Sequence, residues 1–274
     1  MAVHTKLLRK DIKRILAFYD IGELISYSGI NEGIENTNYK IKTTYDNFIL
    51  TIFEKRVNKQ SLPFFLKLMS KCHNNKFQCP QPVIDKKGKD LNEHNSKSFA
   101  FFSFLSGKSK KIWTENECFE VGKILGYFHS TNSKFDLKIE NEFSIEFWKN
   151  TFNKIKKKIN KAPPEVLEVL EKEIIFLSQK WPNFLPKGII HADLFPDNIF
   201  FLDSKISGIL DFYFSCYDQL IYDVAITCNA WCFKNGKFQK SFFKNLIAGY
   251  ENFRIINLKE KKNMNIIMRG AAIR

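Results

Sequence analysis

The chain has 274 residues, of which 44% are hydrophobic and 28 are phenylalanine, and its formal net charge is +14. This length and apolar content predict a globular protein with a sizeable core and exclude an intrinsically disordered chain. No run of about 18 apolar residues and no signal-peptide core occurs, so we predict a cytoplasmic protein with no membrane partner.

The excess positive charge is densest at residues 154–161, where Ile155 and Ile159 recur at the spacing of one helix face. This pattern predicts a solvated helix, and we expect no nucleic-acid partner. The six cysteines form no C-x-x-C pair, which predicts reduced, buried thiols. The sequence carries no signal of oligomeric state.

The first part of the chain alternates between extended segments and two short helices. Helical spacing of apolar residues predicts a helix over residues 10–19. A second helix is expected after Ser61, which can cap it, with Pro63 in the first turn. Strands are expected at residues 21–27, 38–42, 47–54, 83–91 and 99–105. Residues 1–106 therefore predict a β-rich N-terminal lobe.

Beyond residue 106 the apolar pattern becomes helical, and helices are expected over residues 118–128, 166–177 and 242–250. Residues 107–274 thus predict a mostly helical C-terminal lobe. The expected fold class is α+β with two lobes, and a nucleotide is expected in the cleft between them.

Three side chains at kinase-like spacing are the strongest functional signal. The segment His191-Ala-Asp193-Leu-Phe-Pro-Asp-Asn198 follows a short apolar run, and Asp211-Phe-Tyr follows another. In phosphoryl transfer an Asp accepts the proton of the substrate hydroxyl, while an Asn and a second Asp hold Mg²⁺ on ATP. Asp193 is therefore the candidate base, and Asn198 and Asp211 are the candidate metal ligands. The alternative is that each is an ordinary turn or cap residue.

A family resemblance extends over nearly the whole chain. It rests on the segments beginning at His191 and Asp211, on Tyr222-Asp223-Val-Ala-Ile, on Asn229-Ala-Trp-Cys-Phe and on Cys79-Pro-Gln-Pro. The chain resembles the bacterial homoserine kinases that have the aminoglycoside-phosphotransferase-like, protein-kinase-like fold. The resemblance implies ATP-dependent phosphorylation of L-homoserine in threonine biosynthesis. It also implies a further helical segment beyond Arg274, so the chain is expected to be a fragment.

The resemblance and the local pattern suggest further binding residues. We expect the nucleotide to contact the turn at residues 29–38, the strand end near residue 55 and the segment at residues 101–106. The candidate nucleotide-binding residues are Gly33, Asn36, Asn38, Lys55, Phe104 and Ser106. Asp218 and Asp223 are candidates for the substrate ammonium, although Asp223 could equally cap a helix. His129 resembles a structural histidine.

One departure from the kinase pattern keeps other functions open. Thr51 stands where protein kinases have a strand Lys that holds the α- and β-phosphates, and Lys55 or Arg56 could replace it. The alternatives are a kinase acting on choline, an aminoglycoside or another amino alcohol, and a nucleotide-binding regulator with impaired catalysis.

Overall fold

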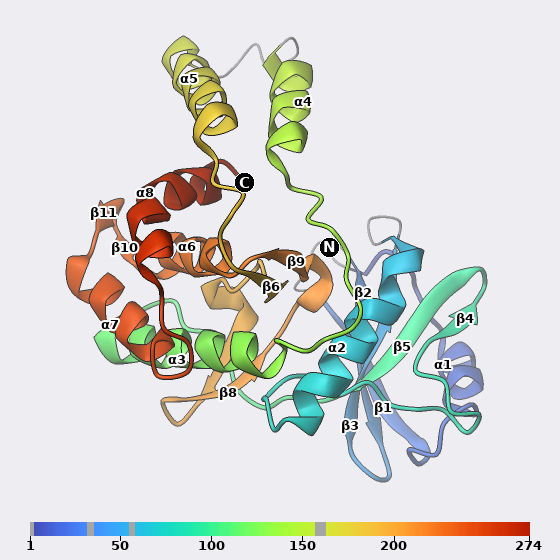
Figure 1. Ribbon diagram of the computed structural model, residues 1–274. Helices are drawn as coiled ribbons and strands as arrows, with labels where there is room; N and C mark the ends of the chain where they lie inside the picture. The colour runs from blue at the N-terminus through green and yellow to red at the C-terminus, as the bar shows by residue number, and fades with distance from the viewer. Residues whose placement is uncertain (1–2, 32–35, 55–57, 157–162) are drawn as a thin grey trace. The chain divides into compact units, whose positions relative to one another are not determined.

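The computed structural model describes residues 3–31, 36–54, 58–156 and 163–274, which form two compact units (Figure 1). The first unit comprises Met1–Lys108 together with Phe200–Tyr213, and the second comprises Ser109–Ile199 and Phe214–Arg274. The segment at residues 200–213, which we assigned to the C-terminal lobe, thus belongs with the N-terminal unit.

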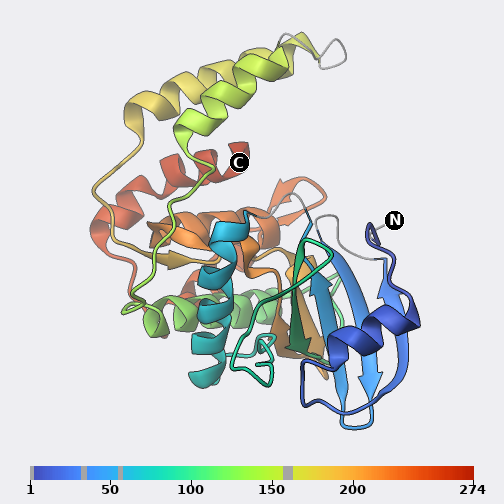
Figure 2. The ribbon, with the colours of Figure 1, turned by 90° about the vertical axis from the view of Figure 1, so that its right-hand side faces the viewer.

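A five-stranded antiparallel sheet forms the first unit, with strand order β1-β2-β3-β5-β4. The strands are β1 (Leu24–Ile30), β2 (Thr37–Thr43), β3 (Asn47–Ile52), β4 (Asn92–His94) and β5 (Lys97–Ser103). Helix α1 (Arg9–Leu16) packs Ile12 and Ile15 on one face of the sheet. The sheet residues of this core are two positions apart on each strand: Leu50 and Ile52 on β3, and Phe99 and Phe101 on β5. Period-two alternation therefore creates one apolar face that α1 covers (Figure 2).

Two local predictions in this unit are wrong. Residues 85–90 form a turn in which Asp85 Oδ1 accepts the N–H groups of Lys87 and Lys89, so the strand expected at 83–91 is replaced by the later, shorter β4. Ser61 does not cap α2 (Leu62–Asn74) through its side chain, because a 3₁₀ turn, Lys59–Ser61, precedes that helix and Asn58 caps the turn. Pro63 lies in the first turn of α2, as predicted.

The hairpin of β7 (Ile199–Leu202) and β8 (Lys205–Ile209) joins the first unit through the segment after β5. The backbones of Lys108 and Phe201 exchange two hydrogen bonds, and Ser207 Oγ donates to the carbonyl of Ser106 at 2.7 Å. Gly107 adopts a φ of 128°, which a residue with a Cβ rarely adopts. The segment His191–Asn198, which contains the candidate base, is called the catalytic segment below. The strands predicted on either side of it are confirmed by β6, β7 and β8.

Helices dominate the second unit, as predicted. They are α3 (Glu115–Thr131), α4 (Ile145–Lys156), α5 (Pro164–Lys180), α6 (Leu220–Trp231), α7 (Lys240–Tyr250) and α8 (Leu258–Ile273). A two-stranded antiparallel sheet, β6 (Lys187–Ile190) and β9 (Cys216–Gln219), carries the catalytic segment at the end of β6, and a short hairpin, β10 (Phe233–Lys234) with β11 (Lys237–Phe238), follows α6. Among the described residues, no helix is long and apolar enough to span a membrane.

Close backbone contact joins α3 to α7. A Cβ at Gly122 would overlap the carbonyl oxygen of Leu246, and one at Gly249 would overlap that of Phe119. Glycine is required here because the two helix backbones touch.

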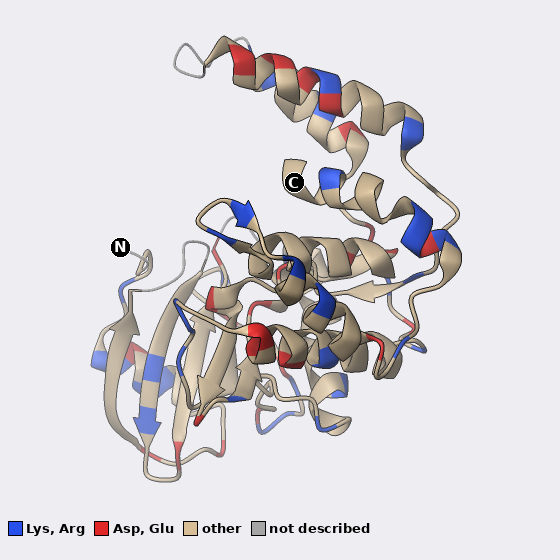
Figure 3. Ribbon diagram, turned by 90° about the vertical axis from the view of Figure 1, so that its left-hand side faces the viewer, with Lys and Arg blue, Asp and Glu red and all other residues tan. Residues whose placement is uncertain are grey.

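The helices α4 and α5 run side by side and carry mixed charge (Figure 3). Lys156 pairs with Glu171 at 2.7 Å, and Lys172 pairs with Glu168 four residues earlier. The basic cluster predicted as a helix face thus begins on α4, although residues 157–161 lie outside the described part of the chain. All six cysteines are buried, as predicted, and none of them forms a disulfide in this structure.

Candidate active site

The catalytic segment follows β6 as a tight loop with a strained backbone. Ala192 has a φ of 61°, in the left-handed region that residues with a Cβ seldom occupy. Such strain persists only where the surroundings impose it, and it is common at active sites.

Asp223, in the first turn of α6, imposes this loop conformation. Its Oδ2 accepts the N–H of His191 at 2.7 Å, and its Oδ1 accepts the N–H of Ala192 at 2.9 Å. The side chain is fully buried. The geometry therefore makes Asp223 the anchor of the loop. Of the two roles that the sequence left open, it speaks against binding of the substrate ammonium, because the fully buried carboxylate is enclosed by the groups that it already binds.

Two buried side chains, His129 and Tyr250, hold Asp223 in turn. His129 Nε2 lies 3.0 Å from Asp223 Oδ2, and His129 Nδ1 lies 2.8 Å from the hydroxyl of Tyr250. Burial lowers the pKa of His129, so we assign a neutral ring that donates to Asp223 and accepts from Tyr250. Burial alone would raise the pKa of Asp223, but the interaction with His129 lowers it. His129 thus has the structural role expected of it.

Asp193 and Asn198 lie together at the end of this loop. Asn198 Nδ2 donates to both the backbone carbonyl and Oδ2 of Asp193, each at 2.8 Å. With its N–H₂ group so occupied, the amide of Asn198 leaves its Oδ1 as the atom that a cation could bind. Trp231 Nε1 fixes the intervening turn by donating to the carbonyl of Leu194 at 2.8 Å.

The carboxyl group of Asp193 is unusually basic. Burial raises its pKa from 3.8 to about 6, although Arg274 and the hydrogen bond from Asn198 act in the opposite direction. A carboxylate with a pKa near the working pH is suited to accept a proton from an alcohol.

Asp211, the third member of the motif, belongs to the first unit, where it follows β8. Its φ is 59°, so the predicted metal ligand also has a left-handed backbone. The side chain is half-buried, and its charge contributes, after burial, to raising the pKa of Tyr213.

Two of the predicted nucleotide-binding residues bond within the sheet. Thr51 Oγ1 donates to Asn38 Oδ1 at 2.8 Å, across the β2–β3 pair, and Asn36 Oδ1 accepts the N–H of Glu54 at 3.3 Å. Thr51 is buried, so the residue at the position where protein kinases have Lys stabilises the pairing of β2 with β3.

The remaining nucleotide-binding candidates lie after β5 or outside the described residues. Phe104 is partly exposed and carries Lys40 Nζ 4.1 Å above its ring, and Ser106 contacts β8 through Ser207. Gly33 and Lys55 fall outside the described residues.

Asp218 lies on β9, in the second unit. Its Oδ2 accepts from Asn141 Nδ2 and its Oδ1 from the N–H of Gln219, both at 2.7 Å. It is half-buried, and each oxygen retains capacity for a further donor.

Arg274, which we did not predict as a site residue, follows α8 and contacts the candidate base. Its Nη1 lies 3.7 Å from Asp193 Oδ1. The two residues are 81 positions apart in sequence, with no shared motif, so only the packing of α8 reveals the contact. That packing is set by Gly270 against Trp181 and by the bidentate pair of Arg269 with Glu173.

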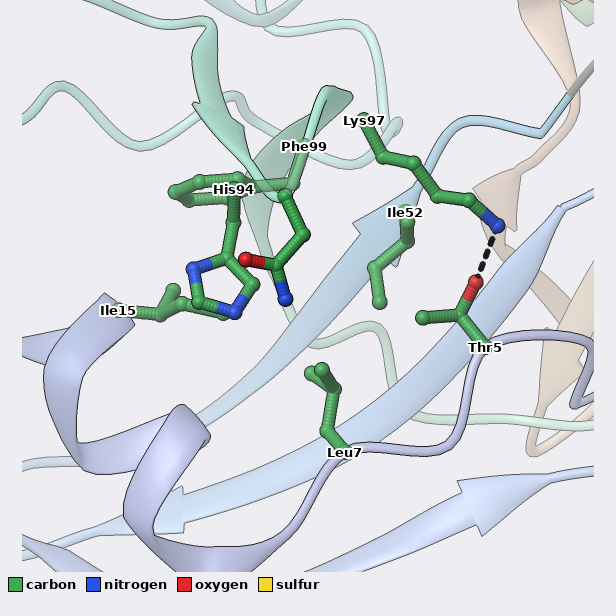
Figure 4. Close-up of a pocket in the computed structure, with 8 residues that line it drawn as sticks. Thr5, Leu7, Ile15, Ile52, His94, Lys97 and Phe99 are labelled. Carbon is green, nitrogen blue, oxygen red and sulfur yellow. Dashed lines mark hydrogen bonds between the residues drawn. The ribbon is translucent and has the colours of Figure 1, made fainter.

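A small cavity of about 70 Å³ lies apart from these residues, in the first unit (Figure 4). It is lined by Ile15 of α1, by residues of the sheet and by Thr5 and Leu7 of the N-terminal segment. Lys97 Nζ, on β5, donates to Thr5 Oγ1 at 2.7 Å. Its lining is mostly apolar and includes no predicted site residue.

Comparison with known proteins places this geometry in a family. Residues 26–256 match the Phosphotransferase enzyme family. The homoserine kinase of Agrobacterium fabrum is 41% identical across 100% of this chain and 85% of its own length. The homoserine kinase of Brucella anthropi is 40% identical across 100% of this chain and 84% of its own length. This chain belongs to the homoserine kinase family.

The fold of the chain also matches solved structures. A complex of amicoumacin kinase with AMP-PNP and Ca²⁺ aligns with a TM-score of 0.77, at 15% identity, over 97% of this chain and 84% of that chain. The likeness confirms the α+β, protein-kinase-like fold class. 

The donors present in the kinase fit a magnesium–nucleotide complex. Mg²⁺ on a nucleotide takes few protein ligands, typically carboxylate or amide oxygens, and the rest from phosphates and water. Asn198 Oδ1, in the second unit, and the Asp211 carboxylate, in the first, are each donors of that kind. Within the described residues, no group of three His, Cys, Asp or Glu side chains forms a self-sufficient metal cage.

Proposed function

We propose that this kinase transfers the γ-phosphoryl group of Mg-ATP to the side-chain hydroxyl of L-homoserine, a step of threonine biosynthesis. The observation that carries the proposal is the double hydrogen bond from the Asn198 amide to Asp193. It fixes the Asp193 carboxylate, which would accept the proton, and leaves the Oδ1 atom of Asn198, which would bind the cation.

Asp193 aligns the substrate hydroxyl and accepts its proton as the bond to phosphorus forms. Its raised pKa favours this proton transfer, and its fixed loop keeps the carboxylate in place before the substrate arrives. Asn198 and Asp211 would hold Mg²⁺, which when bound neutralises charge on the β- and γ-phosphates. 

The substrate is a zwitterion, so its ammonium requires an anionic partner. We assign that role to Asp218, whose carboxylate has oxygens with spare acceptor capacity on β9. For the nucleotide we retain Phe104 and Ser106 near the adenine, with Asn36 and Asn38 shaping the strand that borders the phosphates. We also propose the cytoplasm as the compartment, because six free, buried thiols fit a reducing environment.

A substrate panel with ATP and Mg²⁺ tests the proposal. L-Homoserine should be phosphorylated with a kcat/KM roughly 10⁴-fold above that of choline, because choline has no carboxylate and no N–H, and would leave buried polar partners unpaired. Initial rates for L-homoserine, choline and an aminoglycoside, measured with a coupled ADP assay, provide the comparison. Equal use of choline would contradict the substrate assignment and leave only a broader alcohol kinase. Absence of turnover on every substrate would favour the nucleotide-binding regulator.

A further inference from the structure

A guanidinium group lies beside the proposed base in a fixed orientation. The side chain of Arg274 is only 10% exposed, and its Cζ lies 5.2 Å from the ring centroid of Phe143 and 5.3 Å from that of Phe214. Aromatic rings on the guanidinium restrict its rotation and weaken its contact with water. The group is therefore preorganised.

The contact with Asp193 uses only part of this guanidinium. At 3.7 Å, the Nη1–Oδ1 pair is a loose ion pair, and the Nε atom is buried without a hydrogen-bond partner among the described residues. The hydroxyl of Tyr222 is likewise buried without a partner in the described part of the chain, and Arg274 is the main charge acting to lower its pKa against the effect of burial. Buried donors are almost always satisfied, so the buried Nε of Arg274 indicates a polar ligand at this guanidinium.

We propose that Arg274 binds the carboxylate of the amino-acid substrate. This inference rests on the proposed function and names the partner that the sequence left unassigned. Guanidinium presents a planar fork that matches a carboxylate with two parallel hydrogen bonds. L-Homoserine spans roughly 5 Å from its carboxyl carbon to its hydroxyl oxygen, by standard bond lengths, so a substrate held at Arg274 can reach Asp193 with its hydroxyl.

Two other roles for Arg274 would leave different signatures. A cation that only promotes ionisation of Asp193, or that contacts the γ-phosphate, would assist every alcohol substrate equally. A carboxylate-binding residue assists only substrates that have a carboxylate. The useful comparison is therefore L-homoserine against 3-aminopropan-1-ol, which is the same amino alcohol without its carboxylate.

The experiment measures kcat/KM for both alcohols with the parent, Arg274→Gln, Arg274→Lys and Lys262→Gln. Assays at about pH 8.5 keep Asp193 ionised in every protein and so remove the effect of Arg274 on its pKa. Lys262→Gln is the matched control, since it removes one positive charge from the same helix, α8, at an exposed residue.

We expect Arg274→Gln to lower kcat/KM for L-homoserine by about 100-fold and for 3-aminopropan-1-ol by less than about threefold. Arg274→Lys should recover part of the loss, since it keeps the charge without the fork, and the control should resemble the parent. An equal loss on both alcohols would overturn the inference while leaving the homoserine kinase activity standing. A parent protein inactive on L-homoserine would overturn the proposed function and this inference with it.

A binding measurement without phosphoryl transfer provides the second readout. L-2-Aminobutyrate keeps the ammonium and carboxylate of the substrate but has no hydroxyl to phosphorylate. Its Kd, measured by calorimetry, should rise about 100-fold in Arg274→Gln and stay within about twofold in Lys262→Gln. An unchanged Kd in folded Arg274→Gln would reject the assignment.

Discussion

Burial raises the pKa of Asp193 to about 6 even though Arg274 and Asn198 both favour its ionised form. Arg274 and Asn198 thus offset only part of the free-energy cost of removing the Asp193 carboxylate from water. A basic carboxylate serves proton transfer, but its ionised form is also less stable in the folded protein than in the unfolded chain. Catalysis and stability therefore oppose each other at this residue.

The first prediction follows from this pKa. The kcat/KM for L-homoserine should fall tenfold per pH unit below about pH 6, because only ionised Asp193 accepts the proton. Asp193→Asn should lower kcat by about 10²-fold or more and leave Mg-ATP affinity within a few-fold, since the base acts in the transition state. A pH–rate profile of the parent and calorimetric titration of the variant check both statements; near-normal turnover in the variant would exclude Asp193 as the base.

Stability supplies an independent check on the same substitution. The folded pKa is raised from 3.8, so the stabilising effect of protonating Asp193 is fully present below about pH 3.8 and is lost as the pH rises through about 6. At neutral pH, Asp193→Asn should therefore unfold with a free energy up to about 3 kcal/mol above that of the parent, and the advantage should shrink towards pH 4. Denaturant unfolding at the two pH values measures it.

At the scale of elements, the pairing of α3 with α7 positions the two side chains that hold Asp223 and, through it, the loop that carries Asp193. His129 belongs to α3 and Tyr250 to α7, and their 2.8 Å contact supports Asp223. Arg254, just beyond α7, donates to the Tyr250 hydroxyl at 3.0 Å and to the buried Glu260 of α8 at 2.7 Å. The close approach that Gly122 and Gly249 permit therefore bears on the geometry of the loop as well as on the core.

A substitution at Gly122 tests this helix contact. Helix propensity alone would make Gly122→Ala stabilising by about 1 kcal/mol, but its Cβ would overlap the carbonyl of Leu246. We expect the overlap to dominate and destabilise the protein by roughly 2–4 kcal/mol, because a close-packed backbone contact cannot relax without separating the helices. Lys123→Ala, at the next and exposed position, is the control. A thermal midpoint for Gly122→Ala equal to or above that of the parent would contradict the packing argument.

At the scale of the whole molecule, the sequence predicted the features that neighbouring residues determine, namely the catalytic motif and most of the strands and helices. Asp193, Asn198 and Asp211 lie within 19 positions of one another, and the apolar runs around them predicted the strands that carry them. Period-two and helical spacing likewise located most of the sheet and the helices α1, α3, α5 and α7. The turn at Asp85 was missed because side-chain hydrogen bonds to its own backbone outcompeted strand pairing there.

Long-range partners could not be predicted from local pattern. Asp223 binds a loop 31 and 32 residues earlier, and its sequence context fits a helix cap or a ligand equally well. Arg274 reaches Asp193 only because Gly270, which has no side chain, lets α8 pack against the Trp181 ring. Both contacts depend on tertiary packing, which a single sequence does not display.

The motif itself is divided between the two units, since Asp193 and Asn198 belong to the second and Asp211 to the first. Ligands that bind only the folded protein stabilise it by an amount that grows with the logarithm of their concentration relative to Kd, and reaches about 2.7 kcal/mol at 100 times Kd. Nucleotide-induced stabilisation therefore reports on the metal ligands without requiring turnover.

The last prediction uses this effect on Asp211. Asp211→Asn should weaken Mg-ATP binding at least about 10-fold and remove most of the rise in thermal midpoint that Mg-ATP produces, because a charged ligand is lost from a cation that faces several phosphate oxygens. Adding EDTA to the parent should reduce its nucleotide stabilisation to the level of the variant. Asp203→Asn is a matched control: it makes the same charge change in the same β7–β8 region, at another left-handed residue with a φ of 47°, a conformation that Asn tolerates as well as Asp. Equal Mg-ATP affinity for Asp211→Asn, Asp203→Asn and the parent, measured by calorimetry, would show that Asp211 does not hold the metal.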